Sequence, residues 1–283
     1  MSKLAETIHS MVVAPGRLAV VWLGGAGFVF KTASGRIVAI DPYLSDSLDH
    51  TYSWKRLPLS PIPMAPAELQ ADLVLATHAH EDHLDPETIP ELVRSSQAVV
   101  AGPAMCAEAM RSWGLPKERI VEINRGESRS IAGVGVTAVL AHHVSPAGAQ
   151  TPDAVGYVLD LDGIVVYHTG DSLYHPDLQR QVKAMSPAVK VAMVCINGQY
   201  GNMNPIEAAR LTWEVGPTAV IPMHWGLVGE NTADPADFVE ALAALPNSWG
   251  RGDTGAGQNS SGARTRPLVL LPGDMVLSSF ARV

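Results

Sequence analysis

Six side chains that can bind a metal ion are crowded into residues 77–85, THAHEDHLD. They are His78, His80, Glu81, Asp82, His83 and Asp85. The segment directly follows the apolar run ADLVLA, which has the composition of a buried strand. Charged groups next to a core element are unfavourable unless they are paired or coordinate a metal. The pattern HxHxDH at the end of an apolar strand therefore predicts a metal site. The alternative, a charged loop that enters a helix, leaves the three histidines unexplained.

The spacing within this segment indicates that it can supply ligands to two metal ions. His78 and His80 are two residues apart, so on extended backbone their imidazole rings point to the same side. Asp82 and His83 follow at a turn before a predicted helix, where a change of chain direction can aim them at a neighbouring position. The HExxH motif of zinc proteases is excluded, because its second histidine would fall on Leu84.

Further candidate ligands follow three later apolar strands. His142 and His143 come after AVLA, Asp171 comes after VVYHTG, and His224 comes after VIPM. All stand at junctions between a strand and a loop, where open α/β architectures build their sites. Only one of His142 and His143 can face the site on extended backbone, and the residues alone leave that choice open. His168 alternates with its neighbours inside a strand, and we expect it to be packed rather than to bind metal.

Other polar residues are candidates to support these ligands or to contact a substrate. Asp41 ends a predicted strand and could hold a histidine ring in one tautomer, as carboxylates often do beside metals. Capping the turn before the next proline is an equal alternative. The loop INGQYGNMN opens from a buried strand and offers Asn197, Tyr200 and Asn202 as pocket residues. Asp82 is the catalytic candidate, because its carboxylate could orient a water molecule and accept its proton.

The elements that must position these residues alternate between strands and helices. The first half begins with the β-rich runs LAVVWLG, GFVFKT and RIVAID, and the chain closes with LVLL and DMVLSSF, which we interpret as strands. Two halves of this kind predict two sheets packed face to face with helices outside. We expect a single domain over residues 1–283, with an irregular proline-rich loop at 41–68 and a flexible surface loop at 248–265.

Composition excludes several classes of function. The net charge of −8 and the pI near 5.6 disfavour binding to nucleic acid. Glu6 and His9 interrupt the start of the chain where a signal peptide would be apolar, and no apolar run is long enough to span a bilayer. We therefore expect a cytoplasmic protein that acts on a small molecule, without a membrane partner. Cys106 and Cys195 do not form a CxxC pair, and we expect both to be buried and to bind no metal.

Taken together, these motifs resemble the metallo-β-lactamase superfamily. The resemblance runs from WLGGAGFVFK and DPYLSDS through THAHEDHLD and GDS to NPIEAA and IPMHWG. Within the superfamily the blocks are similar to the branch that resembles L-ascorbate-6-phosphate lactonase. The resemblance implies a four-layer αββα sandwich with the metal site at one edge between the two sheets. It also implies one metal held by His78, His80 and His143, a second held by Asp82, His83 and His224, and Asp171 as a bridge.

The activity implied by the resemblance is that of a metal-dependent hydrolase. Five imidazoles and two carboxylates suit Zn²⁺, and the lactonase relatives suggest Mn²⁺ as the alternative. A hydroxide bridging the two metals would be the nucleophile, because coordination lowers the pKa of water from about 15.7 to about 7. The implied substrate is a lactone or ester of a small sugar acid, with or without a phosphate group. Lys55, Arg56 and Arg125 are candidates to bind such a phosphate.

Two other functions stay open, a phosphodiesterase that acts on a small phosphodiester and a non-catalytic sensor that binds metal. The branch also implies self-association as a homo-oligomer.

Overall fold

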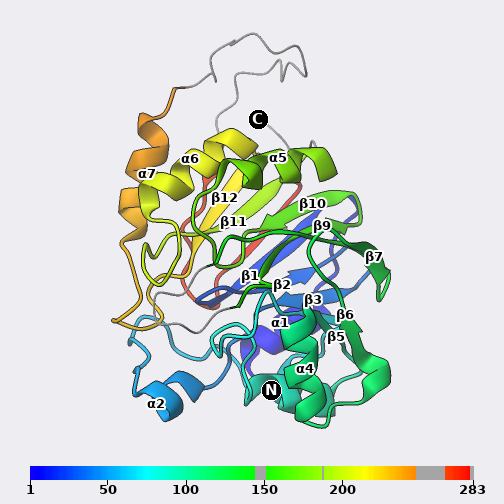
Figure 1. The fold of residues 1–283 in the computed structure, drawn as a ribbon. Coiled ribbons are helices and arrows are strands. Elements are labelled where there is room, and N and C mark those ends of the chain that lie inside the picture. The colour runs from blue at the N-terminus through cyan, green and yellow to red at the C-terminus, as the bar shows by residue number, and fades with distance from the viewer. Residues whose placement is uncertain (144–150, 187, 247–264, 281–283) are drawn as a thin grey trace.

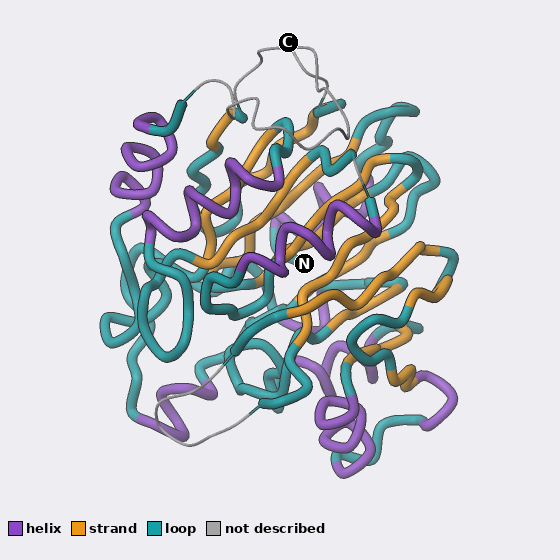
Figure 2. Tube along the Cα trace, turned by 45° about the horizontal axis from the view of Figure 1, so that its top comes forward, coloured by secondary structure: helices purple, strands orange, loops and turns teal. Residues whose placement is uncertain are grey.

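Two mixed β-sheets packed face to face form the centre of the molecule, and helices cover both outer faces (Figures 1 and 2). The computed structural model describes residues 1–143, 151–186, 188–246 and 265–280. The expected αββα sandwich is confirmed. No helix within these described ranges is long and apolar enough to cross a membrane.

The first sheet has the strand order β14-β1-β2-β3-β4-β5-β6. Its antiparallel part contains β14 (Met275–Ser278), β1 (Leu18–Gly24), β2 (Gly27–Lys31) and β3 (Ile37–Ile40). Its parallel part continues with β4 (Leu73–Leu75), β5 (Val99–Gly102) and β6 (Ile120–Glu122). The connections carry α3 (Thr88–Ser95) and α4 (Ala104–Ser112), and α1 (Lys3–Ser10) precedes β1. Parallel strands need such crossovers, which explains the alternation in the sequence.

The second sheet has the strand order β13-β12-β11-β10-β9-β8-β7. Its antiparallel part contains β7 (Ser128–Ile131), β8 (Val134–Leu140), β9 (Val155–Leu161) and β10 (Ile164–His168). Its parallel part contains β11 (Val191–Cys195), β12 (Ala219–Met223) and β13 (Arg266–Pro267). The outer helices are α5 (Pro176–Met185), α6 (Pro205–Val215) and α7 (Pro235–Ala244).

Helix α6 is capped at both ends. The Asn204 side chain accepts hydrogen bonds from the backbone N–H groups of Ile206 and Glu207, and the Glu207 carboxylate accepts the Asn204 N–H at 3.0 Å. This capping box satisfies donors that the first turn of a helix leaves free. Gly216 ends the helix in the left-handed conformation, at φ 70°.

Two hydrophobic cores hold the layers together. The larger core lies between the sheets and under α5 and α6, and it includes Trp22, Phe28, Tyr157 and Tyr167. The smaller core lies between the first sheet and the helices α1, α3 and α4. Because both faces of the central strands are covered, β1, β2, β3, β11 and β12 are buried along their whole lengths. The strand ends are thereby fixed, and the candidate ligands follow them at one edge of the sandwich.

Two expectations about local structure are wrong. The run LVLL was expected to be a strand, but β13 ends at Pro267 and the run lies outside any strand. Val269 and Leu271 are 46% and 56% exposed, so the run is apolar without being a core strand. The expected irregular loop at 41–68 contains the helix α2 (Ser47–Tyr52) and a 3₁₀ turn at Pro66–Glu68. The predicted flexible loop at 248–265 lies, apart from Thr265, outside the described residues.

Candidate metal centre

Three histidines meet at one side of the site. His78 follows β4, His80 lies two residues later, and His143 follows β8. His80 Nδ1 lies 3.0 Å from His78 Nε2 and 3.2 Å from His143 Nε2. Ligand atoms of the three rings all lie within 4.8 Å of one another, as a shared cation would require.

A second set lies beside the first and contains Asp82, His83 and His224. His224 Nε2 lies 3.2 Å from His83 Nε2 and 3.2 Å from Asp82 Oδ2. Both histidines are fully or almost fully buried, and the Asp82 side chain is 17% exposed. Two imidazole nitrogens and a carboxylate oxygen form a donor set that suits Zn²⁺ and similar divalent metals.

Asp171 connects the two sets. Its Oδ1 atom lies 3.3 Å from His83 Nε2 and 3.3 Å from His224 Nε2, and it also falls within a group formed with His78 and His83. Gly170 brings this carboxylate close, because its φ of +58° and its packing leave no room for a side chain. A Cβ there would approach the Val155 carbonyl oxygen to 2.6 Å.

The buried polar atoms of this cluster fit a bound metal. Within the described residues, Asp171 Oδ1 is buried without a hydrogen-bond partner, although it faces His83 Nε2 and His224 Nε2. Several of the closest contacts join one ring nitrogen to another, and such pairs satisfy each other poorly. Divalent metal ions would give these lone pairs a partner, so the residues fit the cofactor that the sequence predicts.

The backbone at the site differs from the extended chain that the sequence suggested. Strand β4 ends at Leu75, and residues 77–80 form bends rather than a strand. The rings of His78 and His80 therefore converge through a tight bend. Asp41 and His224 both have positive φ, at 45° and 63°. Such conformations are costly for residues other than glycine and are concentrated at functional sites.

Asp41 supports the ligands rather than capping a turn alone. Its Oδ2 atom lies 2.7 Å from His83 Nδ1 and accepts a hydrogen bond from Thr77 Oγ1 at 2.7 Å, and its Oδ1 atom accepts the Thr77 N–H. Thr77 Oγ1 in turn lies 3.0 Å from His78 Nδ1. These contacts favour a proton on Nδ1 of both rings and leave Nε2 for the metal.

A chain of buried amides holds Asp171. Asn202 Nδ2 donates to Asp171 Oδ2 at 2.7 Å and to Asn197 Oδ1 at 3.1 Å, and Asn197 Nδ2 donates to Asn231 Oδ1 at 2.6 Å. The structure thus brings the predicted Asn197 and Asn202 to the site as supports of a carboxylate. Sequence reasoning missed Asn231, because nothing in the segment around it has a recognisable pattern.

The remaining histidines have other surroundings. His142 is exposed, and its ring stacks on that of His175 at 5.5 Å. His168 is buried, with Nε2 2.9 Å from the Ala26 carbonyl oxygen and Nδ1 accepting the Gly170 N–H. The structure therefore places His143, and neither His142 nor His168, among the candidate ligands. Both cysteines are buried and free, as expected.

The electrostatics of the two sets differ. Burial lowers the pKa of His78 well below 6.5, and the positive charge of His83 lowers it further, so His78 is neutral and ready to bind. Burial also lowers the pKa of His224, but Asp171 and Asp82 outweigh that effect and raise it to about 9. Burial raises the pKa of Asp171, but His224 and His83 lower it well below its usual range. Without metal, the second set is therefore a cluster of imidazolium and carboxylate groups.

Two of the three candidate phosphate ligands have structural partners. Arg56 bonds Asp46 and the carbonyl oxygens of Ser45 and Ser60. Arg125 Nη2 donates to the carbonyl oxygens of residues 141, 152 and 154. Lys55 is exposed. The guanidinium groups of Arg56 and Arg125 therefore stabilise loops through these hydrogen bonds, which leaves them poorly placed to bind a phosphate.

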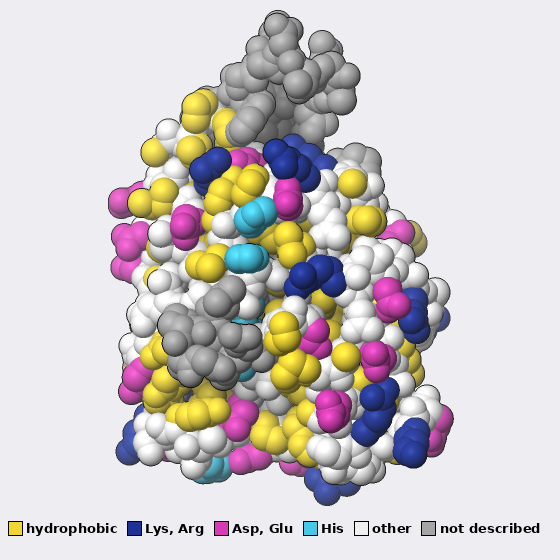
Figure 3. Space-filling model, in the orientation of Figure 1, with side chains coloured by type: hydrophobic (Ala, Val, Ile, Leu, Met, Phe, Trp, Pro, Cys, Tyr) yellow, Lys and Arg dark blue, Asp and Glu magenta, His cyan; other side chains and the backbone are white. Residues whose placement is uncertain are grey.

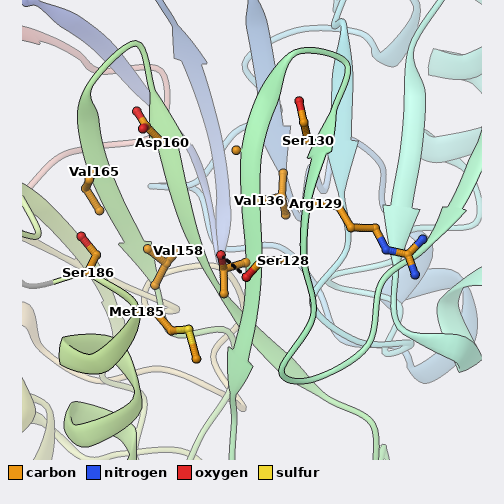
Figure 4. A pocket seen from close by; sticks show the side chains of 11 residues that line it. Ser128, Arg129, Ser130, Val136, Val158, Asp160, Val165, Met185 and Ser186 are labelled. Carbon is orange, nitrogen blue, oxygen red and sulfur yellow. Dashed lines mark hydrogen bonds between the residues drawn. The ribbon is translucent and has the colours of Figure 1, made fainter.

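The surface view shows histidine side chains in a line down the middle of one face (Figure 3). A separate hollow of about 380 Å³ is drawn in Figure 4. Its walls come from β7, β8, β9, β10 and the end of α5, and among the described residues no candidate ligand lines it. This hollow is therefore distinct from the candidate metal centre.

Residues 19–224 match the profile of the Beta-lactamase superfamily domain. The chain belongs to the metallo-β-lactamase superfamily. A UPF0173 metal-dependent hydrolase of Thermococcus kodakarensis is 31% identical over 220 residues, which cover 77% of this chain and 89% of that protein. A UPF0173 metal-dependent hydrolase of a Polaromonas species is 29% identical and covers 97% of this chain and 98% of its own length. The metallo-β-lactamase chain described here is accordingly an enzyme, a metal-dependent hydrolase.

Solved structures agree on the fold. The metallo hydrolase Igni18 of Ignicoccus hospitalis superposes with a TM-score of 0.70 at 23% identity, covering 93% of this chain and 98% of that one. The metallo-β-lactamase fold protein YhfI of Bacillus subtilis gives a TM-score of 0.63 at 14% identity, covering 93% of this chain and all of that one.

Proposed function

We propose that this metallo-β-lactamase hydrolase uses two divalent metal ions to open a lactone or an ester of a small sugar acid. One observation carries the proposal. The two ligand sets are adjacent, the Asp171 carboxylate lies between them, and the side chain of Asp82 is partly exposed whereas that of Asp171 is buried. His78, His80 and His143 would hold one metal, and Asp82, His83 and His224 would hold the other, with Asp171 between them. Bound there, the metals would supply a water of lowered pKa and polarise a carbonyl group.

Each supporting residue of the chain has a separate task. Asp41 fixes the tautomer of His83 through the 2.7 Å contact with Nδ1. Asn202 holds Asp171 Oδ2, which turns Oδ1 toward His83 and His224. Asp82 is the more exposed of the two cluster carboxylates, at 17% against 5% for Asp171, so it can reach a water molecule from the solvent side. We assign to Asp82 the task of orienting that water and accepting its proton.

The choice of substrate rests on the donor set and on the similarity to the lactonase-like branch. A carbonyl substrate needs no cationic pocket. A phosphate group would need one, but Arg56 and Arg125 already hold backbone and carboxylate partners, which leaves the exposed Lys55 as a single cation. We therefore favour an ester or lactone without phosphate over the phosphorylated form and over a phosphodiester. Zn²⁺ is the metal that five imidazoles and two carboxylates favour, and Mn²⁺ is the alternative.

The test loads metal-free protein with Zn²⁺ or Mn²⁺ in parallel. The substrates are a panel of sugar lactones, L-ascorbate 6-phosphate with its unphosphorylated counterpart, and bis(p-nitrophenyl) phosphate. We expect turnover of lactones that requires metal and disappears in His78→Ala and His224→Ala. Turnover of the phosphodiester alone would replace the proposal with a phosphodiesterase. Tight metal binding without turnover of any substrate would favour the sensor.

A further inference from the structure

Three aromatic side chains form a continuous surface that we call the aromatic wall: Tyr52, Trp54 and Tyr200. The rings of Tyr52 and Trp54 have centroids 5.9 Å apart, and those of Trp54 and Tyr200 lie 5.4 Å apart. Tyr52 is the last residue of helix α2 and Trp54 follows the helix, whereas Tyr200 belongs to the loop after β11. Two segments about 150 residues apart in the chain thus contribute to one surface.

The aromatic wall is attached to two segments of the metal centre. Trp54 packs on a cluster that contains Leu227, three residues after the candidate ligand His224. Tyr200 is two residues from Asn202, whose amide bonds Asp171 at 2.7 Å. The wall therefore lies beside the segment that carries His224 and the loop that holds Asp171.

The aromatic wall is held in place by the loop that follows His224. The Leu57 N–H donates to the Leu227 carbonyl oxygen at 2.8 Å, and Arg56 pairs with Val228 in a β-bridge. Trp54 packs on a small apolar cluster formed by Tyr43, Leu48, Leu227 and Val228. The surface is thus preformed, and little ordering would be needed when a ligand binds.

Aromatic rings beside a catalytic centre can bind an apolar part of the substrate. Tyr52 is 55% exposed, so its ring contributes little to the core and is free to contact a ligand. Aromatic faces bind other planar apolar groups by stacking or edge contacts. The committed guanidinium groups of Arg56 and Arg125 make a charged tail a poorer match for this surface.

We propose that the aromatic wall binds a planar apolar group, such as an aryl ring, that the substrate carries beside its scissile ester or lactone carbonyl. The proposal keeps the ester or lactone hydrolase proposed above but replaces the sugar acid with an acid that carries an aryl group, and it rests on that function for the position of the carbonyl. The wall would determine specificity, whereas the chemistry stays with the metal centre.

The experiment compares two probes that differ by one ring, phenylacetate and acetate, as ligands of the zinc-loaded protein. Binding is measured by calorimetry, and hydrolysis of the methyl esters of both acids is measured separately. The variants are Tyr52→Leu, which removes the ring, and Tyr52→Phe, which keeps it. Because Tyr52 is exposed, we expect both variants to melt like the wild type.

We expect the wild type to bind phenylacetate more tightly than acetate, and Tyr52→Leu to weaken phenylacetate binding 5- to 20-fold. We expect Tyr52→Phe to keep the preference, and the ratio of kcat/KM for the two methyl esters to follow the same order. No preference for phenylacetate in the wild type, or an unchanged preference in Tyr52→Leu, would overturn the proposal. If binding depends on the ring but neither ester is hydrolysed, the ester hydrolase proposal fails while the aromatic wall stands.

Discussion

At the scale of single residues, Asp41 shows how a side chain outside the ligand set can control it. It is fully buried and connects Thr77 to His83. We expect Asp41→Asn to weaken metal binding about 10- to 100-fold, because an amide cannot replace the carboxylate that fixes the ring of His83. Competition with a chelator of known affinity measures this. Asp162→Asn is the matched control, because Asp162 also has a positive φ and lies on the hairpin between β9 and β10. Equal affinities for both variants would contradict the role given to Asp41.

The adjacent histidines allow a second comparison at this scale. His143 lies in the first ligand set, whereas His142 is exposed and stacks on His175. We expect His143→Ala to lose at least about one order of magnitude in affinity at one metal site, because three ligands become two. His142→Ala should bind metal as the wild type does. Titration of both variants with Zn²⁺ measures these affinities. A loss of affinity in His142→Ala but not in His143→Ala would make His142 the ligand instead of His143.

At the scale of elements, the position of Asp171 depends on a glycine. Gly170 has φ +58°, and a Cβ there would also approach Thr77 Cβ to 3.2 Å. We expect Gly170→Ala to cost more than Gly163→Ala by about 1–3 kcal/mol in unfolding free energy. Gly163 is the matched control, because its φ is +85° and a Cβ there would meet nothing within 4 Å. Urea unfolding measures the difference. Equal losses would show that backbone conformation, rather than crowding beside Thr77, sets the cost.

The sequence predicts the elements better than their details. Periodicity and apolar runs identify the strands that carry the site, because both faces of the central strands are buried. The pattern fails at LVLL, which is apolar but partly exposed. It also fails for the bends at 77–80 and for the positive φ of Asp41 and His224, because tertiary contacts impose them. The aromatic wall could not be predicted either, since it joins segments that have no shared pattern.

At the scale of the whole molecule, the metal centre links stability to pH. In metal-free protein the pKa of His224 is raised from 6.5 to about 9, since Asp171 and Asp82 outweigh burial. A raised pKa stabilises the fold fully below pH 6.5, and that contribution is lost as pH rises toward 9. We expect the metal-free protein to lose on the order of 3 kcal/mol over this range. Zinc-loaded protein should not, because its imidazoles are already neutral ligands. Urea unfolding at several pH values measures the unfolding free energy of the metal-free and the zinc-loaded protein. The same dependence on pH in both forms would contradict the prediction.

The most direct test of the central claim is the number of zinc ions bound per chain, measured by elemental analysis after loading and removal of excess metal. Two adjacent ligand sets predict two ions in the wild type. They also predict about one ion in His78→Ala and about one in His224→Ala, because each substitution removes a ligand from a different set. A single ion in the wild type, or two ions in both variants, would contradict the two-metal account.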